Sequence, residues 1–529
     1  MALQRPLVRI GLGLSLWMAL TAQSVAQQSG AGASTSSVDP SLTETVKQLQ
    51  QQVNELRAVV SDLRTESEHY RAETQALREE LRSAVTQVSH SAQASGEGAT
   101  GAQSMGENPN STHAESSSSA RLEKLEEQYD LLTGKIDDQY QTKVDSSSKY
   151  RVGLSGLALL NLFTNRGGVD NADLPGLVNG PDALGRAGST GLSFRQSQIG
   201  FEVFGPEFAG ARTHGEVHFD FAGGFPNTPN GITFGLMRLR TGTIHLDWAH
   251  TSVIAGQDSP FFSPLSPTSF ATVAEPAFAY AGNLWTWIPQ IRVEHRIATS
   301  ENSNFTLQAG ILDGVTGEPP GSPWVRIAQA GEYSRQPGYG SRVAWSHRLF
   351  GPSMTFGAGG YYSRQHWGLG RNIDAYAGTV DWTIPLAPRL GLTGEFFRGR
   401  ALGGLGGGLY QSALYNGYPT NPASSIRGLD AMGGWTQLKF RASSKVEFNA
   451  GVGQDNPFAG ELRAFPYSAY QTNQQNGVVT RNQNELFNVI YRPRSDLIFS
   501  AEYRHIGTYE PDSTRYTADH INLVMGILF

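Results

Sequence analysis

The chain has 529 residues, of which 61 are glycine and none is cysteine, so it can form neither a disulfide framework nor a thiolate metal site. Its formal net charge of −6 lies wholly in residues 1–149, which hold 13 Lys+Arg and 19 Asp+Glu, whereas residues 150–529 hold 28 of each. Neither part has the basic face of a nucleic-acid-binding protein, so no nucleic-acid partner is expected.

The first 26 residues are typical of an export signal. Arg5 and Arg9 precede an apolar run over 10–20, and residues 24–26 (Ser-Val-Ala) are small enough for cleavage. The alternative is a membrane anchor, but the run is about half the ~20 residues that a spanning helix needs. We therefore predict a cleaved signal peptide over 1–26. No other stretch is long and apolar enough for a transmembrane helix, so a membrane location would require a β-barrel.

Residues 40–88 follow a heptad pattern. One seam position is Leu42, Leu49, Leu56, Leu63, Tyr70, Leu77 and Ala84, and the other is Val46, Val53, Val60, Ser67, Thr74, Leu81 and Val88. The narrow stripe favours an α-helical coiled coil, roughly 70 Å long, over a lone amphipathic helix. Valine opposite leucine favours two strands, but Ser67 and Thr74 leave the oligomer number open.

Two further segments precede the strands. Residues 89–120 consist mainly of Ser, Gly, Ala and Glu with little to bury, which indicates a flexible linker. Residues 121–140 restart the heptad and predict a second, short coiled-coil helix.

After Lys149 the hydrophobic period changes to 2, and residues 149–529 predict an antiparallel β-barrel of about 16 strands. The strands are expected near 149–162, 190–204, 211–222, 234–249, 251–258, 285–297, 303–313, 338–348, 353–363, 372–384, 388–399, 431–442, 445–453, 484–493, 496–506 and 517–529. Their connections alternate between short and long, with long ones at 163–189, 259–284, 314–337, 400–430 and 454–483. This alternation is typical of a barrel with tight periplasmic turns and long outer loops.

The strands themselves have one apolar and one charged face. In 216–221 and 290–297 every second residue is apolar and most of the others are charged. A soluble antiparallel sheet also alternates in this way. The number of ionic residues per strand favours a barrel whose water-filled interior can solvate them. We therefore predict an all-β transmembrane antiparallel barrel, preceded by an N-terminal periplasmic α-helical coiled coil.

The last strand ends on alternating apolar residues and a final Phe529. We expect it to pair with the first strand, because an exposed apolar edge invites aggregation. A terminal strand ending on Phe resembles the assembly signal of Gram-negative outer-membrane barrels, and Phe529 carries that resemblance.

Three short motifs resemble one porin family: "FRQSQIGFEVFGP" (194–206), "LMRLRTGTIHLDW" (236–248) and "AGQDSPF" (255–261). In the last, Gly256, Gln257, Pro260 and Phe261 are similar to the family's Gly-Gln…Pro-Phe turn. With the layout of residues 40–529, they resemble coiled-coil-bearing Gram-negative outer-membrane porins of the phosphate-selective porin O/P type and related dicarboxylate-specific porins. The resemblance implies an outer-membrane trimer that conducts small anions through pores narrowed by inward loops. Phosphate-selective members use lysine clusters, whereas this barrel has only Lys439 and Lys445 beside 26 arginines, so phosphate specificity is not carried over.

Arginine suits a carboxylate or phosphate solute, because its planar fork binds two oxygens and stays charged. The strand phase places these candidates in the lumen: Arg238, Arg240, Arg292, Arg296, Arg342, Arg348, Arg441 and Arg504. The alternative is structural pairing across strands with lumen carboxylates, namely Glu202, Glu216, Asp220, Asp247, Glu294, Glu395, Glu447 and Glu502. The loop 259–284 is apolar for an exposed loop, and predicts either a pore constriction or a subunit contact.

The sequence offers no enzymatic motif that would support a catalytic role. The sequence has no G-x-S-x-G, no H-E-x-x-H and no Walker loop, and no two of its twelve histidines pair at metal-ligand spacing. We expect no cofactor or metal, although a hydrolase site assembled from distant strands stays open. The predicted function is an outer-membrane porin for small anionic solutes such as phosphate or carboxylates, surrounded by outer-membrane lipid. The alternative is a structural protein that tethers the envelope to peptidoglycan through its coiled coil.

Overall fold

The computed structural model describes residues 143–144, 150–181, 184–225, 235–318, 325–348, 352–468 and 479–529. The chain divides into two compact units, Met1–His113 and Ala114–Phe529, and every described residue belongs to the second. The predicted signal peptide, coiled coil, linker and short helix (1–26, 40–88, 89–120 and 121–140) therefore lie outside the described residues. Among the residues that the structure describes, no helix combines the length and hydropathy of a membrane span.

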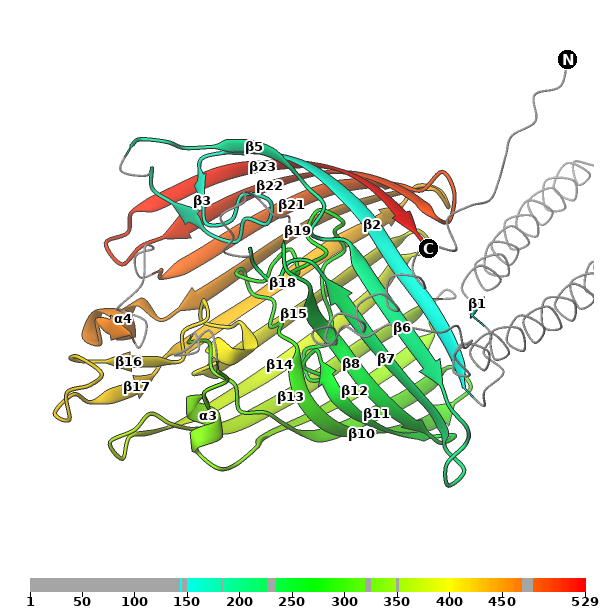
Figure 1. The fold of residues 1–529 in the computed structure, drawn as a ribbon, viewed down its shortest axis with the longest axis horizontal. Helices are drawn as coiled ribbons and strands as arrows, with labels where there is room; N and C mark the ends of the chain where they lie inside the picture. The colour runs from blue at the N-terminus through cyan, green and yellow to red at the C-terminus, as the bar shows by residue number, and fades with distance from the viewer. Residues whose placement is uncertain are drawn as a thin grey trace, which may run out of the picture. The chain divides into compact units, whose positions relative to one another are not determined.

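The described chain forms a closed antiparallel barrel (Figure 1). Each strand pairs with the next along the chain, β9 pairs with β10, and β23 pairs with β2 to close the ring. The main sheet has 18 segments. β1 (Lys143–Val144) is only a two-residue antiparallel partner beside β2, and β5 and β6 are two halves of one strand, which leaves sixteen. The strands are β2 (Arg151–Arg166), β5 (Ser189–Ser193) with β6 (Gln198–Phe204), β7 (Arg212–Asp220), β8 (Arg238–Asp247), β9 (Thr251–Asp258), β10 (Ile288–Ser300), β11 (Ser303–Leu312), β12 (Gly338–Arg348), β13 (Ser353–His366), β14 (Asn372–Ala387), β15 (Leu390–Arg400), β18 (Asp430–Arg441), β19 (Val446–Pro457), β21 (Arg481–Tyr491), β22 (Leu497–Tyr509) and β23 (Arg515–Leu528).

The predicted sixteen-strand antiparallel barrel is thus confirmed, with two differences in detail. The expected strand 190–204 is interrupted between β5 and β6. The connections 367–371 and 510–514, at the long-loop end, are short, so the long and short connections do not alternate strictly. The reason is that β13 and β22 both continue beyond their predicted ends, to His366 and Tyr509.

Small elements fill the long connections. β3 (Gly168–Val169) pairs with β4 (Val178–Asn179), and β16 (Ala413–Tyr415) lies between β17 (Ile426–Gly428) and β20 (Tyr467–Ser468). Three helical turns, α3 (Ala330–Tyr333), η1 (Gly403–Leu405) and α4 (Ala459–Ala464), complete these loops. In Figure 1 they lie towards the left-hand end of the barrel, opposite the short turns.

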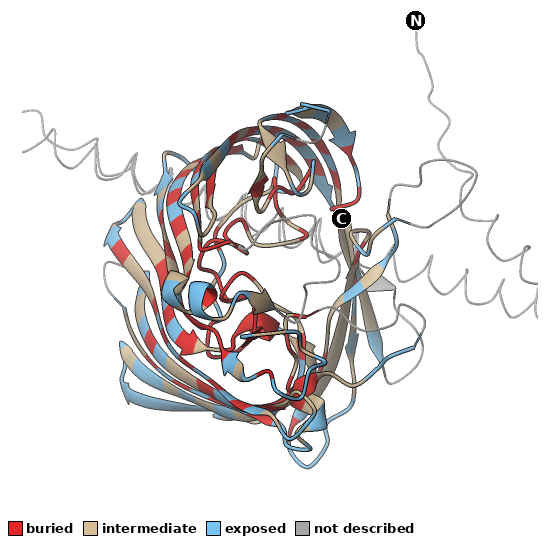
Figure 2. Ribbon diagram, turned by 90° about the vertical axis from the view of Figure 1, so that its left-hand side faces the viewer, coloured by how far each residue is buried: buried red, intermediate tan, exposed pale blue. Residues whose placement is uncertain are grey.

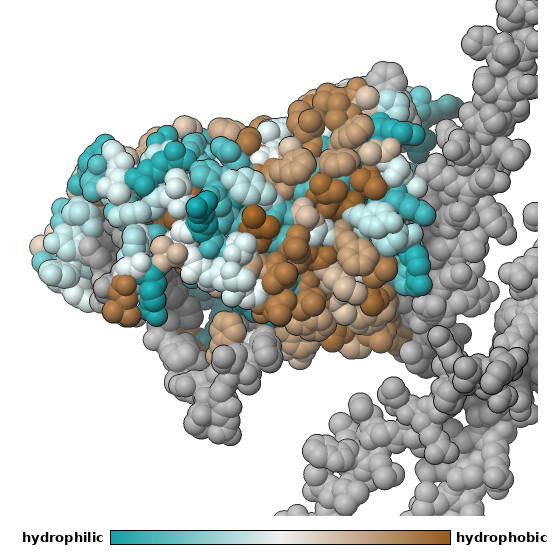
Figure 3. Space-filling model, turned by 90° about the horizontal axis from the view of Figure 1, so that it is seen from above, coloured by the Kyte–Doolittle hydropathy of each residue, from teal (hydrophilic) through white to brown (hydrophobic). Residues whose placement is uncertain are grey.

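The barrel wall is apolar outside and polar inside. Large apolar side chains are exposed at alternate strand positions, among them Leu160, Leu162, Phe201, Ile291, Val293, Phe305, Val343, Phe356, Val380, Leu438, Phe487, Leu523 and Met525. Figure 3 shows such side chains as a brown band between two hydrophilic ends. The neighbours that point inward are buried and polar, for example Asn161, Gln437 and Asn522. An apolar outer band with a polar interior is the pattern of a transmembrane barrel.

The chain terminus is paired, as predicted. Leu157 to Arg166 of β2 align with Leu528 to Asp519 of β23, and the Gly156 N–H donates to the Phe529 carbonyl oxygen over 2.8 Å. The Phe529 ring lies over Gly156, where a Cβ atom would come within 2.3 Å of the ring, so only glycine leaves room for it. The role of Phe529 as an assembly signal stays a prediction.

The interior is not empty. Buried apolar side chains of the loops pack against the inner wall, and one cluster joins Phe261, Phe262 and Leu284 to Phe397 and Leu402. Figure 2, which looks into the ring of strands, shows buried segments crossing its interior. The loops therefore narrow the barrel from within.

Candidate pore constriction

The connection between β9 and β10, residues 259–287, crosses the lumen and is held at both walls. On one side, Glu395 of β15 accepts hydrogen bonds from the Ser263 hydroxyl (2.8 Å) and the Leu265 N–H (2.7 Å). On the other, Gln196, between β5 and β6, donates to the Ala271 carbonyl oxygen and accepts from the Val273 N–H, each over 2.8 Å. Of the two alternatives for this loop, these contacts support a constriction.

Further wall residues fix the middle of this loop. Gln437 and Asn488 both donate to the Thr268 carbonyl oxygen, over 3.1 and 3.0 Å. The Ser269 hydroxyl donates to Glu502 over 2.6 Å, and Asn484 donates to the Ala277 carbonyl oxygen over 3.0 Å. Polar groups of the lumen wall thus satisfy loop backbone groups that would otherwise be buried without partners.

Arg238 and Arg240 lie where this loop meets β8. Both form ion pairs with the buried Asp220 of β7, at 2.9 and 3.0 Å. They also donate to the loop carbonyl oxygens of Ala274 (2.7 Å) and Val273 (2.8 Å). These two guanidinium groups and the one carboxylate that they share together carry one net positive charge.

A β-bulge at Arg240 explains why Arg238 and Arg240 face inward although, from Thr241 on, it is the odd-numbered residues of β8 that face inward. Thr241 pairs with His218, but Leu239 pairs with Phe219, so Arg240 is the extra residue. Such a bulge re-aims the side chains that follow it. Both guanidinium groups lie over the Trp287 ring, at 5.0 and 4.8 Å from its centroid.

Arg292 and Arg296 of β10 also face the lumen. Arg292 donates to Asp258 over 2.8 Å and lies 6.0 Å from the centroid of the Phe261 ring. Arg296 is half exposed, with a distant contact of 3.9 Å to Glu294. Of these two, Arg296 is the more accessible to a solute.

The remaining candidate arginines are distributed around the wall. Arg342 makes a bidentate pair with Asp381, with bonds of 2.9 and 2.7 Å, and both residues are buried. Arg504 lies 3.5 Å from Glu502, and Arg441 lies 3.7 Å from Glu447. Arg348 is exposed at the end of β12 and makes no ion pair with another described residue. Seven of the eight arginines therefore lie within 3.9 Å of a carboxylate, although Arg296 and Arg504 meet one on their own strand and not on a neighbouring strand. Their role in selecting solutes stays a prediction.

Sequence reasoning missed several charged groups at the constriction. Arg195 makes a bidentate pair with Asp173 of the first long loop, and both are buried. Glu275, in the inward loop, lies in the field of Arg238 and Arg195, and its burial raises the pKa of its carboxyl group to about 7. Arg195 belongs to the motif 194–206, but the pairing could not be foreseen because its partner comes from a loop.

The Gly-Gln pair of the motif 255–261 has a structural role. Gly256 has φ +145°, and a Cβ atom there would lie 2.1 Å from the Gly242 carbonyl oxygen of β8. Gln257 donates to the Arg240 carbonyl oxygen over 2.9 Å. The motif therefore holds β9 tightly against the bulged part of β8, just before the inward loop begins.

The chain matches no protein-family model, and no curated protein matches it. Its structure is similar to that of the outer membrane channel DcaP of Acinetobacter baumannii, with a TM-score of 0.54 and 13% identity over 73% of this chain and 100% of that one. It also matches the anion-selective porin from Comamonas acidovorans (TM-score 0.43, 11% identity, 72% and 100% covered) and OmpT of Vibrio cholerae (0.41, 10%, 73% and 99%). At 13% identity the likeness to DcaP shows a shared barrel fold, and the other two, with TM-scores below 0.5, add nothing to it.

Proposed function

We propose that this chain is an outer-membrane porin of a Gram-negative bacterium, a water-filled channel through which small solutes diffuse, with a preference for anions. The observation that carries the proposal is the inward loop 259–287 with the Arg238–Arg240 pair against it. A loop held across the lumen beside unbalanced positive charge is what a selective channel needs.

The outer surface supports the membrane location. Backbone groups in hydrocarbon must be satisfied internally, which a closed barrel achieves because it has no free strand edge. The apolar band (Figure 3) supplies the surface that outer-membrane lipid would cover. We also propose that the barrel forms the homo-oligomer, a trimer, that the family resemblance implies.

The charges support the anion preference and the solute class. Asp220 neutralises one of its two arginine neighbours, and Glu275 is partly protonated near neutral pH because of its raised pKa. A phosphate or carboxylate that reaches the pair would accept charge-assisted hydrogen bonds while partly stripped of water. Guanidinium binds phosphate and carboxylate alike, so the proposal covers both kinds of anion and assigns no selectivity for phosphate.

Conductance in planar bilayers tests the proposal. The purified protein should give stepwise ion currents, with reversal potentials under a KCl gradient that report anion preference. The fourfold variant Arg238→Gln, Arg240→Gln, Arg292→Gln and Arg296→Gln should lose that preference. A protein that folds but gives no current steps is not a porin, and an unchanged fourfold variant would make these arginines structural.

The heptads of residues 40–88 motivate a second candidate function, a periplasmic tether to peptidoglycan. Deleting 40–140 separates the two functions, because the barrel would keep its conductance while the envelope became weaker. An envelope that is as resistant to detergent after the deletion as before would exclude the tether.

A further inference from the structure

Two histidines and an aspartate meet on the lumen wall, away from the constriction. His214 of β7 pairs directly with His245 of β8, and Asp247 follows two residues later on the same face. Ile244, the residue before His245 on β8, is 65% exposed on the outer surface. Because successive residues of a strand face opposite sides, His245, Asp247 and the paired His214 point inward. They lie close to the short turn 248–250, at the opposite end of β8 from Arg238.

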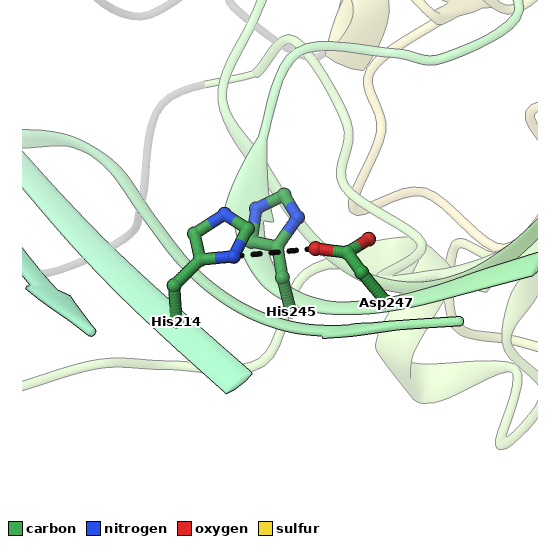
Figure 4. Close-up of side chains that lie close together, drawn as sticks. All are labelled: His214, His245 and Asp247. Carbon is green, nitrogen blue, oxygen red and sulfur yellow. Dashed lines mark ion pairs between the residues drawn. The ribbon is translucent and has the colours of Figure 1, made fainter. Parts of the chain in front are cut away.

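The three side chains lie close together (Figure 4), and the distances between their ligand atoms are near those of a metal site. His214 Nδ1 lies 3.2 Å from Asp247 Oδ2, and the two imidazole rings stack with centroids 4.1 Å apart. One ligand atom from each of the three residues lies within 4.8 Å of the other two. Ligands at 2.0–2.2 Å from a tetrahedral ion are separated by about 3.3 Å. One pair is already at that separation, and side-chain rotation brings in the third.

Hydrogen bonds that link His245 through Thr243 to Glu216 fix the tautomer of His245. The Thr243 hydroxyl donates to Glu216 over 3.0 Å, because an ionised carboxylate can only accept. The same oxygen then accepts from His245 Nε2–H over 2.9 Å. His245 Nδ1 is left with its lone pair, which is the form that a metal ligand requires. A carboxylate that orients a ligating histidine in this way is a usual companion of metal sites.

We propose that His214, His245 and Asp247 bind a divalent first-row transition-metal ion in the lumen. Two imidazoles and one carboxylate suit Zn²⁺, Ni²⁺ or Cu²⁺ rather than Ca²⁺ or Mg²⁺, which prefer all-oxygen sites. Three protein ligands leave room for water, and the partial burial of the residues gives the ion access from the lumen. Among the described residues, no other group of three such ligands is close enough to share an ion.

Zinc titration of the folded, detergent-solubilised full chain, prepared without a histidine tag, tests the site. Calorimetry at pH 7.5 should show one Zn²⁺ per chain. The double variant His214→Gln and His245→Gln removes two of the three ligands and should abolish zinc binding. Thr243→Val, which changes only a residue that positions His245, should weaken binding by about 10–100-fold. The matched control is His505→Gln, which removes a histidine paired with Asp519 at 2.8 Å but with no second histidine, and should bind zinc as the parent does.

Acidification supplies a second readout, because protonated imidazole cannot ligate. Zinc should leave the parent as the pH falls below about 6, and return when the pH is restored. Equal zinc affinity in the double variant and the parent would overturn the proposal, as would the absence of zinc binding by the parent. Both measurements report binding alone, so they stand whether or not the protein conducts ions.

Discussion

Changing the charges around Asp220 one at a time should shift the ion selectivity of the channel in both directions. The parent holds two guanidinium groups against one carboxylate at 2.9 and 3.0 Å, for a local charge of +1. Asp220→Asn raises that charge to +2. Arg238→Gln lowers it to 0, and the double variant Arg238→Gln and Arg240→Gln lowers it to −1. Anion preference should therefore be strongest in Asp220→Asn, weaker in the parent, weaker again in Arg238→Gln and weakest in the double variant.

The magnitude follows from Coulomb's law. At ~6 Å from a permeating ion, one unit charge contributes about 0.7 kcal/mol at the dielectric constant of water. At 0.1 M salt, where the Debye length is about 10 Å, screening reduces this to roughly 0.4 kcal/mol. The three charge units between the extreme variants then amount to about 1.1 kcal/mol for an anion and the same amount with opposite sign for a cation. The anion-to-cation permeability ratio should therefore change by about 2.3 kcal/mol, or roughly 50-fold.

Reversal potentials at pH 6, where Glu275 is largely protonated, measure this ratio directly under a KCl gradient. The control is Arg494→Gln, which breaks a similar arginine–carboxylate pair, with Asp496, in an exposed short turn outside the lumen. It removes one positive charge and should leave the permeability ratio unchanged. Circular dichroism and the electrophoretic mobility of unheated samples would show that each variant is folded.

Two results would refute the reasoning. If Asp220→Asn and Arg238→Gln shift the reversal potential in the same direction, local charge does not set selectivity. If Arg494→Gln shifts it as far as Arg238→Gln does, the effect comes from total charge and not from the constriction.

The other predictions concern pH, stability and assembly. The anion preference should rise as the pH falls through about 7, because Glu275 then gains a proton and loses its negative charge; Glu275→Gln should abolish this pH dependence in reversal-potential measurements, and a persistent dependence would assign it to another group. Arg342→Met should destabilise the barrel by about 3–5 kcal/mol in urea unfolding, because Asp381 is left buried and unpaired, whereas adding Asp381→Leu should recover much of the loss; equal losses would argue against a buried pair. Leu56→Asp with Leu63→Asp should loosen the oligomer in crosslinking experiments, because each change buries a charge in the predicted heptad seam, and an unchanged crosslinking pattern would reduce the coiled coil to a spacer.

The strands were predictable because their information is local. Alternation of apolar and polar residues follows from the two-residue repeat of a strand, so it can be read without knowing what each strand pairs with. Both ends of the strand predicted over 251–258 agree with β9. The pairing of the last strand with the first followed from the apolar terminus. The errors concern strand ends, such as His366, where β13 runs on into a tight turn, and the break between β5 and β6.

The candidate site was only half predictable. Strand phase placed Arg238, Arg240 and Arg292 in the lumen, but their partnerships depend on residues brought from elsewhere in the chain. The bulge at Arg240 changes the phase of β8 and turns His245 and Asp247 inward, opposite His214. No spacing motif in the sequence links His214 with His245, which are 31 residues apart, although the register of the β7–β8 hairpin would have suggested their contact.

The sequence by itself determined the barrel, its strand count and its polar interior, because periodicity and turn composition act over a few residues. Only the tertiary structure decided that the loop 259–287 crosses the lumen, that seven of eight candidate arginines have carboxylate partners, and that two histidines meet. These features depend on register, on one inserted residue and on contacts between walls far apart in the chain. The free energy of such contacts exists only once the ring has closed.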